Sequence, residues 1–192
     1  MRWITIILVF LLSINLTAIA DDKAVMVLSN YAMKYSIETS ASKETIWHLW
    51  SDVENWEEFD EHLEYSKLID DVSFSVGDKG IIKSKGAPRT VFELTNVDRG
   101  KSFTEVLKLP LWQTVHLKRY FEVSPSGKTI FTQEVIFKGG LRSIYHALFG
   151  GAFKKDLPLV MMKMKYLAEQ KEQKILKRVS EPIMYVVNLF FR

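Results

Sequence analysis

The chain has 192 residues, 47% of them hydrophobic, and a formal net charge of +3, which favours one globular domain with a sizeable core. It has no cysteine, so disulfide bonds, thiolate metal sites, a lipoprotein anchor and cysteine catalysis are excluded. The small net charge and an export signal (below) make nucleic acid a poor partner, and we expect none.

The first twenty residues have the pattern of a secretory signal peptide. Arg2 gives a positive start, Ile4 to Leu12 is a nearly continuous apolar run, and Ala18-Ile19-Ala20 is a small-x-small cleavage sequence. The alternative is an uncleaved anchor, although the apolar run is shorter than the roughly 20 residues of a spanning helix. We predict a signal peptide over 1–20 and export, and the absence of disulfides favours the bacterial periplasm.

A strand followed by two short helices is predicted next. Tyr35 to Thr39 alternates like a strand, and Ser40 or Ser42 can cap the following helix, with an acid in its first turn. The apolar residues of the two helices are Ile46, Trp47, Leu49, Trp50, Trp56 and Phe59.

Six further strands are predicted from alternating segments separated by turn residues. They are Leu63–Ile69, Gly80–Ser84, Arg89–Val97, Ser102–Leu109, Thr114–Val123 and Thr129–Phe137. This regular spacing indicates an antiparallel meander.

Helices complete the chain. Gly139-Gly140 ends the sheet, a short helix is expected over Leu141–Phe149, and Gly150-Gly151 separates it from a long helix over about Asp156–Val179. The glycine pairs can be simple helix breaks or the hinges of an entrance flap. The long helix carries one apolar stripe, made of Leu157, Val160, Met161, Met164, Leu167 and Ala168. Three further residues are expected to widen this stripe: Leu159, Met162 and Tyr166.

The opening of the chain resembles a known family. The residues concerned are Ala41, Ser42, Ile46, Trp47, Leu49, Asp52, Trp56 and Phe59. They resemble the START-like or SRPBCC superfamily, in particular its polyketide cyclase/dehydrase and lipid transport branch, and the order of elements is similar from about Tyr31 to Glu172. The resemblance implies an α+β helix-grip fold with six to seven antiparallel strands curved around a long C-terminal helix, enclosing a cavity for a small apolar ligand. We therefore expect a single ligand-binding domain over 21–180 and an apolar tail over 181–192.

Three polar residues are predicted on the core face of the sheet. Pairing the strands by their turns sets Glu105 opposite Arg119 and Arg119 opposite Gln133, among apolar residues that include Val123. Thr132 and its neighbours are expected on the solvent face. Because buried charges need partners, this band is either a structural ion pair or a holder for the polar head of a ligand. The apolar candidates for the cavity wall are Phe92, Leu107, Leu117, Val135, Met161 and Met164.

No catalytic or cofactor motif is found. The four histidines, His48, His62, His116 and His146, lack metal-ligand spacing, and the acids at 57–61 are expected to be solvated. We expect no metal and no cofactor. The resemblance also implies a second possibility, a cyclase or dehydratase in which Glu105 is the base and Arg119 stabilises an enolate.

Charge is unevenly distributed. Residues 38–71 hold eleven acids and two lysines, whereas residues 138–192 hold eleven basic residues and four acids, so an acidic end and a basic end are expected. The tail 183–192 is apolar and can pack on the domain, contact a partner protein, or lie on a membrane beside Lys171, Lys174, Lys177 and Arg178. The predicted function is carriage or sensing of a small hydrophobic or amphipathic ligand, plausibly a lipid or isoprenoid. The alternatives are the enzyme above and a module that docks on a membrane or partner.

Overall fold

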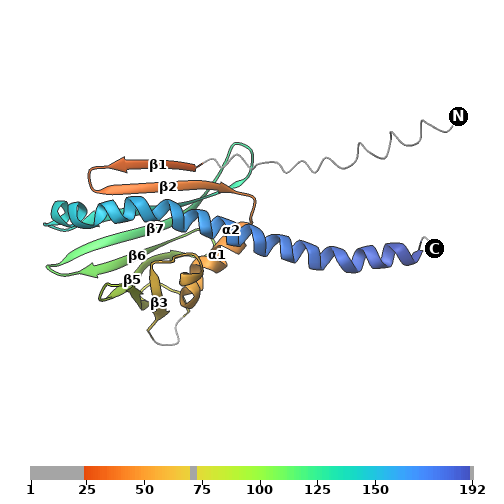
Figure 1. The fold of residues 1–192 in the computed structure, drawn as a ribbon, viewed down its shortest axis with the longest axis horizontal. Helices are drawn as coiled ribbons and strands as arrows, with labels where there is room; N and C mark the ends of the chain where they lie inside the picture. The colour runs from red at the N-terminus through yellow and green to blue at the C-terminus, as the bar shows by residue number, and fades with distance from the viewer. Residues whose placement is uncertain (1–23, 70–72, 191–192) are drawn as a thin grey trace.

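The computed structural model describes residues 24–69 and 73–190, and within them the chain forms one α+β domain. An eight-stranded antiparallel sheet carries a long helix across one face (Figure 1). The strands are β1 (Ala24–Ser29), β2 (Ala32–Thr39), β3 (Leu63–Leu68), β4 (Lys79–Ser84), β5 (Arg89–Asp98), β6 (Ser102–Leu109), β7 (Gln113–Val123) and β8 (Thr129–Lys138). The helices are α1 (Lys43–Ser51), the 3-10 helix η1 (Val53–Glu58) and α2 (Arg142–Phe190).

The strands lie in the order β1-β2-β8-β7-β6-β5-β4-β3, so the meander from β3 to β8 closes back onto the N-terminal hairpin. Seven strands match the sequence prediction closely, but the predicted count of six to seven was wrong because β1 was missed. Five of the six residues of β1 are exposed. This edge strand has no buried face, so its sequence lacks the alternation that reveals a strand.

The start of α1 is held by its own cap and by α2. Of the two predicted caps, Ser40 and Ser42, it is Ser42 that caps α1, accepting a hydrogen bond from the Thr45 backbone N–H at 3.2 Å. Across the interface, Thr39 Oγ1 donates to Glu169 of α2 at 2.9 Å, and the Thr45 hydroxyl donates to Glu172. The two carboxylates therefore complement the positive end of α1 and hold the middle of α2 against it.

Aromatic side chains dominate the core between the sheet and the helices. Trp50 and Trp56 are fully enclosed, and the indole N–H of Trp56 donates to the Trp50 carbonyl oxygen at 3.0 Å. The predicted core face of the sheet is confirmed, with two corrections. Val123 is exposed at the end of β7, next to the turn into β8, and Thr132 is buried on the outer face, where its hydroxyl hydrogen-bonds that of Ser36 at 2.9 Å.

The predicted helix break at Gly150-Gly151 was wrong, since α2 is continuous from Arg142 to Phe190. Glycine costs a helix only about 1 kcal/mol per residue, and packing before and after the pair outweighs it: His146 and Phe153 both pack edge-on against Phe137. An entrance flap hinged at this glycine pair is therefore not supported.

The predicted stripe of α2 faces the core, with Leu157, Met161, Met164 and Ala168 buried. The three residues expected to widen it lie outside, because they fall on the solvent side of the helix: Leu159, Met162 and Tyr166.

The expected separation of charge into two ends was also wrong. Lys163 of α2 contacts Glu61 at 2.6 Å and Lys171 contacts Glu58 at 3.6 Å, so the acidic loop after η1 lies against the basic helix. Surface pairs of this kind each contribute little to stability, about 0–1 kcal/mol.

Two predicted segments lie wholly or partly outside the description. Residues 1–20 are not described, and for the tail only the backbone is described, as helix to Phe190 rather than ending near Val179. No described helix combines the length and apolar character needed to cross a bilayer.

Candidate functional site

A cavity of about 370 Å³ lies between the sheet, the loop after η1 and the first half of α2. Its walls are largely apolar, and its polar residues come from both the sheet and the loop. The lining residues are Trp56, Phe59, Asp60, His62, Leu63, Ile82, Ser84, Ala87, Glu105, Leu107, Leu117, Arg119, Gln133, Phe149, Ala152, Phe153, Asp156, Leu157 and Val160.

The predicted polar band exists and is connected. Arg119 Nε donates to Gln133 Oε1 at 3.0 Å, and its Nη1 donates to Glu105 Oε2 at 3.1 Å. Arg119 is paired with Gln133 across β7 and β8 as expected. The predicted Glu105–Arg119 register was wrong by two residues, because Glu105 is paired with Leu117. A shift of two keeps both side chains on one face, so they meet diagonally.

Two aromatic rings enclose the guanidinium of Arg119. Its central carbon lies 5.0 Å from the centroid of Trp56 and 5.1 Å from that of Phe103. Such contacts favour a desolvated cation, and they fix the plane of the guanidinium. The sequence placed Trp56 in the core but gave no sign of this contact, because it depends on how η1 folds over the sheet.

Burial shifts the protonation of this cluster. The removal of water raises the pKa of Glu105 to about 7, against the opposing attraction of Arg119. Burial likewise lowers the pKa of Arg119, while Glu105 and Asp60 oppose that change. The second carboxylate oxygen of Glu105, Oε1, is buried and has no hydrogen-bond partner among the described residues. An unpaired buried oxygen is costly, so the pair is incompletely satisfied.

The loop after η1 brings further polar groups to the rim of the cavity. His62 Nε2 lies 3.3 Å from Asp156 Oδ1 of α2, and the His62 backbone N–H donates to Asp60 Oδ1 at 3.0 Å. Burial raises the pKa of Asp60, which corrects the expectation that the acids of this run are all solvated. The sequence did not identify Asp60 and Asp156 as residues that line the cavity, because each is next to other charged residues and such runs are usually exposed to solvent.

Five of the nine predicted cavity residues line this cavity: Glu105, Arg119, Gln133, Leu107 and Leu117. The other four are fully enclosed in the surrounding core and do not line it: Phe92, Val135, Met161 and Met164. Phe92, for example, stacks on Trp56 with ring centroids 5.6 Å apart, behind the wall. Sheet alternation identifies the inward face, but it cannot separate residues that fill the interior from those that border a space.

No cluster of three or more His, Asp or Glu side chains able to hold a metal ion occurs among the described residues. The polar atoms of the cavity are instead one cation, three carboxyls, an amide, an imidazole and a hydroxyl. This set can accept and donate hydrogen bonds to an organic group.

Comparison with known proteins supports the fold alone. No family model matches the sequence, and no curated protein matches it. Solved structures do match. A protein from Mesorhizobium loti is 17% identical with a TM-score of 0.57, covering 72% of this chain and 97% of its own. A protein from Arthrobacter aurescens is 12% identical with a TM-score of 0.57, covering 76% of this chain and 91% of its own. A protein from Nitrosomonas europaea is 10% identical with a TM-score of 0.56, covering 77% and 99%. Their names state no activity, and at this identity they show an architecture shared among bacterial proteins.

Proposed function

We propose that this protein binds a small amphipathic molecule in the cavity beneath α2 and acts as a carrier or sensor without a cofactor. We further propose that it is a START-like, SRPBCC-type helix-grip protein that is exported to the periplasm. The observation that carries the binding proposal is the cavity of about 370 Å³, whose apolar walls surround the buried Arg119–Glu105–Gln133 cluster. An apolar pocket with a few convergent polar groups is the usual form of a small-molecule site.

The size of the cavity limits the ligand. Pockets for small molecules span roughly 300–1,000 Å³, so this one is at the lower end of that range. It suits a single short chain or a compact isoprenoid unit rather than a two-chain phospholipid held entirely inside.

The charges around the cavity favour a neutral or cationic head group. Its lining includes three acids, Glu105, Asp60 and Asp156. The lining also includes one arginine, Arg119, whose guanidinium already donates hydrogen bonds to Glu105 and Gln133. A carboxylate head would enter beside three acids, whereas a hydroxyl or amine can donate to their oxygens, including the unpaired Oε1 of Glu105. The ligand class that we propose is therefore a short-chain alcohol, a prenyl alcohol or an amine, not a free fatty acid.

A second candidate is the cyclase or dehydratase activity. It is favoured by the position of Glu105, which lines the cavity fully buried beside Arg119, and whose burial raises its pKa to about 7, a value that suits a general acid or base at neutral pH. An enzyme would release a chemically altered molecule, whereas a carrier or sensor returns its ligand unchanged.

The binding proposal is tested by displacing a neutral fluorescent naphthylamine with a straight-chain alcohol, amine and carboxylate of equal length. The carboxylate is expected to bind at least about tenfold more weakly than the alcohol, which corresponds to about 1.4 kcal/mol. Leu117→Trp, which fills the cavity from its floor, is expected to abolish binding of all three.

The matched control is Lys118→Trp, on the same strand but on the outer, exposed face. It should bind like the wild type. Equal affinity of Leu117→Trp and the wild type would place the ligand elsewhere and defeat the proposal. Tightest binding of the carboxylate would keep the cavity as the site but reject the proposed head group.

A further inference from the structure

Large apolar side chains are exposed together at one end of the domain, where β6 turns into β7 and α2 begins. Two hydrogen bonds join these segments: Tyr145 Oη donates to the Pro110 carbonyl at 3.2 Å, and the Leu141 N–H donates to Gln113 Oε1 at 2.9 Å. We call the exposed apolar group here the tip patch, and it consists of Leu111, Trp112, Leu141, Ile144, Leu148 and Phe149.

The helical part of the tip patch is an apolar stripe that faces outward. Leu141, Ile144 and Leu148 are three and four residues apart, so they lie along one side at the start of α2, and Phe149 is adjacent to Leu148. Ile144 is 53% exposed and Leu148 68%. The other side of the same turns packs on the sheet, where His146 contacts the ring of Tyr31 edge-on. The start of α2 therefore buries one side and presents an apolar side to the solvent.

The turn contributes the most exposed aromatic residue of the described chain. Trp112 is 94% exposed, and both it and Leu111 have φ of 56°, in the left-handed region that residues with side chains rarely adopt. Because this turn points two large apolar side chains toward the solvent in a disfavoured backbone conformation, it does not contribute to packing of the core. Local strain of this kind points to a binding role.

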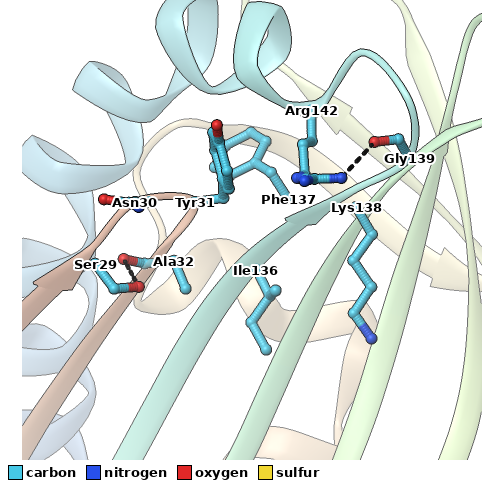
Figure 2. A pocket seen from close by; sticks show the side chains of 9 residues that line it. All are labelled: Ser29, Asn30, Tyr31, Ala32, Ile136, Phe137, Lys138, Gly139 and Arg142. Carbon is cyan, nitrogen blue, oxygen red and sulfur yellow. Dashed lines mark hydrogen bonds between the residues drawn. The ribbon is translucent and has the colours of Figure 1, made fainter.

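The surroundings of the tip patch are basic. From residue 138 to residue 155 the chain has Lys138, Arg142, Lys154 and Lys155 and no acid. None of the four forms an ion pair with a carboxylate of the described residues. Figure 2 shows Arg142 at the start of α2, where its guanidinium lies 4.9 Å from the ring centroid of Tyr31, whereas the side chain of Lys138 points away from α2.

We propose that the tip patch docks on a membrane surface that carries anionic lipids. Tryptophan prefers the membrane interface, and a helix with one apolar side buries that side at the boundary between head groups and acyl chains. Basic side chains beside it are attracted to anionic head groups. A second copy of this chain fits less well, because a symmetric contact would bring two equally basic surfaces together.

The tip patch adjoins the cavity beneath α2. Phe149 belongs to the patch and also lines the cavity, and Ala152 and Phe153 of the next turn line it too. Membrane contact at the patch therefore brings the cavity beside the lipid surface. The tip patch lies at the opposite end of α2 from the C-terminal tail, as Figure 1 shows. The inference does not depend on what the cavity holds.

The test is sedimentation of the full chain with phosphatidylcholine vesicles, with and without phosphatidylglycerol. Ile144→Ser/Leu148→Ser and Lys154→Glu/Lys155→Glu change exposed side chains only, so the fold is kept. Each double variant is expected to lower the partition coefficient for anionic vesicles on the order of tenfold or more. Any binding through residues 1–20 is common to all variants and cancels in the comparison.

Two matched controls lie on the same helix. Leu159→Ser/Met162→Ser removes exposed apolar side chains further along, and Lys174→Glu/Arg178→Glu reverses charge near the tail. Both should sediment like the wild type. The proposal is overturned if phosphatidylglycerol has no effect, if all variants bind alike, or if only the Lys174/Arg178 variant loses binding. A wild-type dimer that Ile144→Ser/Leu148→Ser dissociates, without vesicle binding, would also overturn it and assign the patch to a second copy.

Discussion

The buried pair of Arg119 and Glu105 provides a test of the site that needs no ligand. We predict that Arg119→Met lowers the free energy of unfolding by about 3–5 kcal/mol, because it leaves the carboxylate of Glu105 buried without its cation. The double variant Glu105→Leu/Arg119→Met removes both charges and is expected to be as stable as the wild type or more stable, by up to about 4 kcal/mol.

The expected loss in free energy of unfolding depends on the burial of the two charges rather than on the distance between them. The side chains of Arg119 and Glu105 are 6% and 0% exposed, and their charged atoms are 3.1 Å apart. At an effective dielectric constant of about 20, this separation corresponds to roughly 5 kcal/mol of attraction, which must offset the desolvation of both groups. Removal of one partner loses the attraction but retains the desolvation cost of the other.

Urea unfolding followed by far-ultraviolet circular dichroism, at about pH 8 and so above the pKa of about 7 for Glu105, measures these differences. The pair of Lys108 and Glu93 is the matched control. Its atoms are closer, at 2.7 Å, but its side chains are 55% and 28% exposed, so Lys108→Met should cost about 1 kcal/mol or less. If Arg119→Met lowers the free energy of unfolding no more than Lys108→Met does, burial does not determine the cost of breaking the Arg119–Glu105 pair.

Two further predictions concern protonation and the long helix. Because the folded pKa of Glu105 is raised from 4.5 to about 7, the folded state binds more protons than the unfolded state between these values, and stability falls as pH rises through that window. Glu105→Gln should lack this decline, which in the wild type has a slope of up to about 1.4 kcal/mol per pH unit. If plots of unfolding free energy against pH run parallel for the two proteins from about pH 4.5 to 7, the prediction is contradicted. Gly151→Ala is expected to raise the free energy of unfolding by about 0.5–1 kcal/mol, since a Cβ there meets open space inside a continuous helix, and a loss of stability by thermal unfolding would instead indicate a break at this position.

Much of the sheet could be predicted because its signals are local. The turns at Asp98–Lys101 and Ser124–Gly127, and the alternation on either side of them, located strands to within a residue or two. β1 could not be found in this way, because its exposed residues leave no buried face. The break at Gly150-Gly151 was predicted from propensity alone, and tertiary packing of His146 and Phe153 overrides that propensity.

The candidate site shows a similar division. Alternation along β6, β7 and β8 was enough to bring Glu105, Arg119 and Gln133 to one face, and the error of two residues in register did not matter because it preserves the face. Asp60 of the loop after η1 and Asp156 of α2 were missed, since their position at the cavity depends on how that loop meets α2. Contacts between segments that are far apart in the sequence cannot be predicted from the local residue pattern of either segment.

Native mass spectrometry of the intact protein can determine whether the cavity beneath α2 holds an amphipathic ligand. The full chain is purified from the cells that produce it, and its mass is compared with that of the Leu117→Trp and Lys118→Trp variants. We expect an added lipid-like mass on the wild type and on Lys118→Trp that is absent from Leu117→Trp. A wild-type protein that carries no added mass, or a mass that Leu117→Trp retains in full, would contradict it.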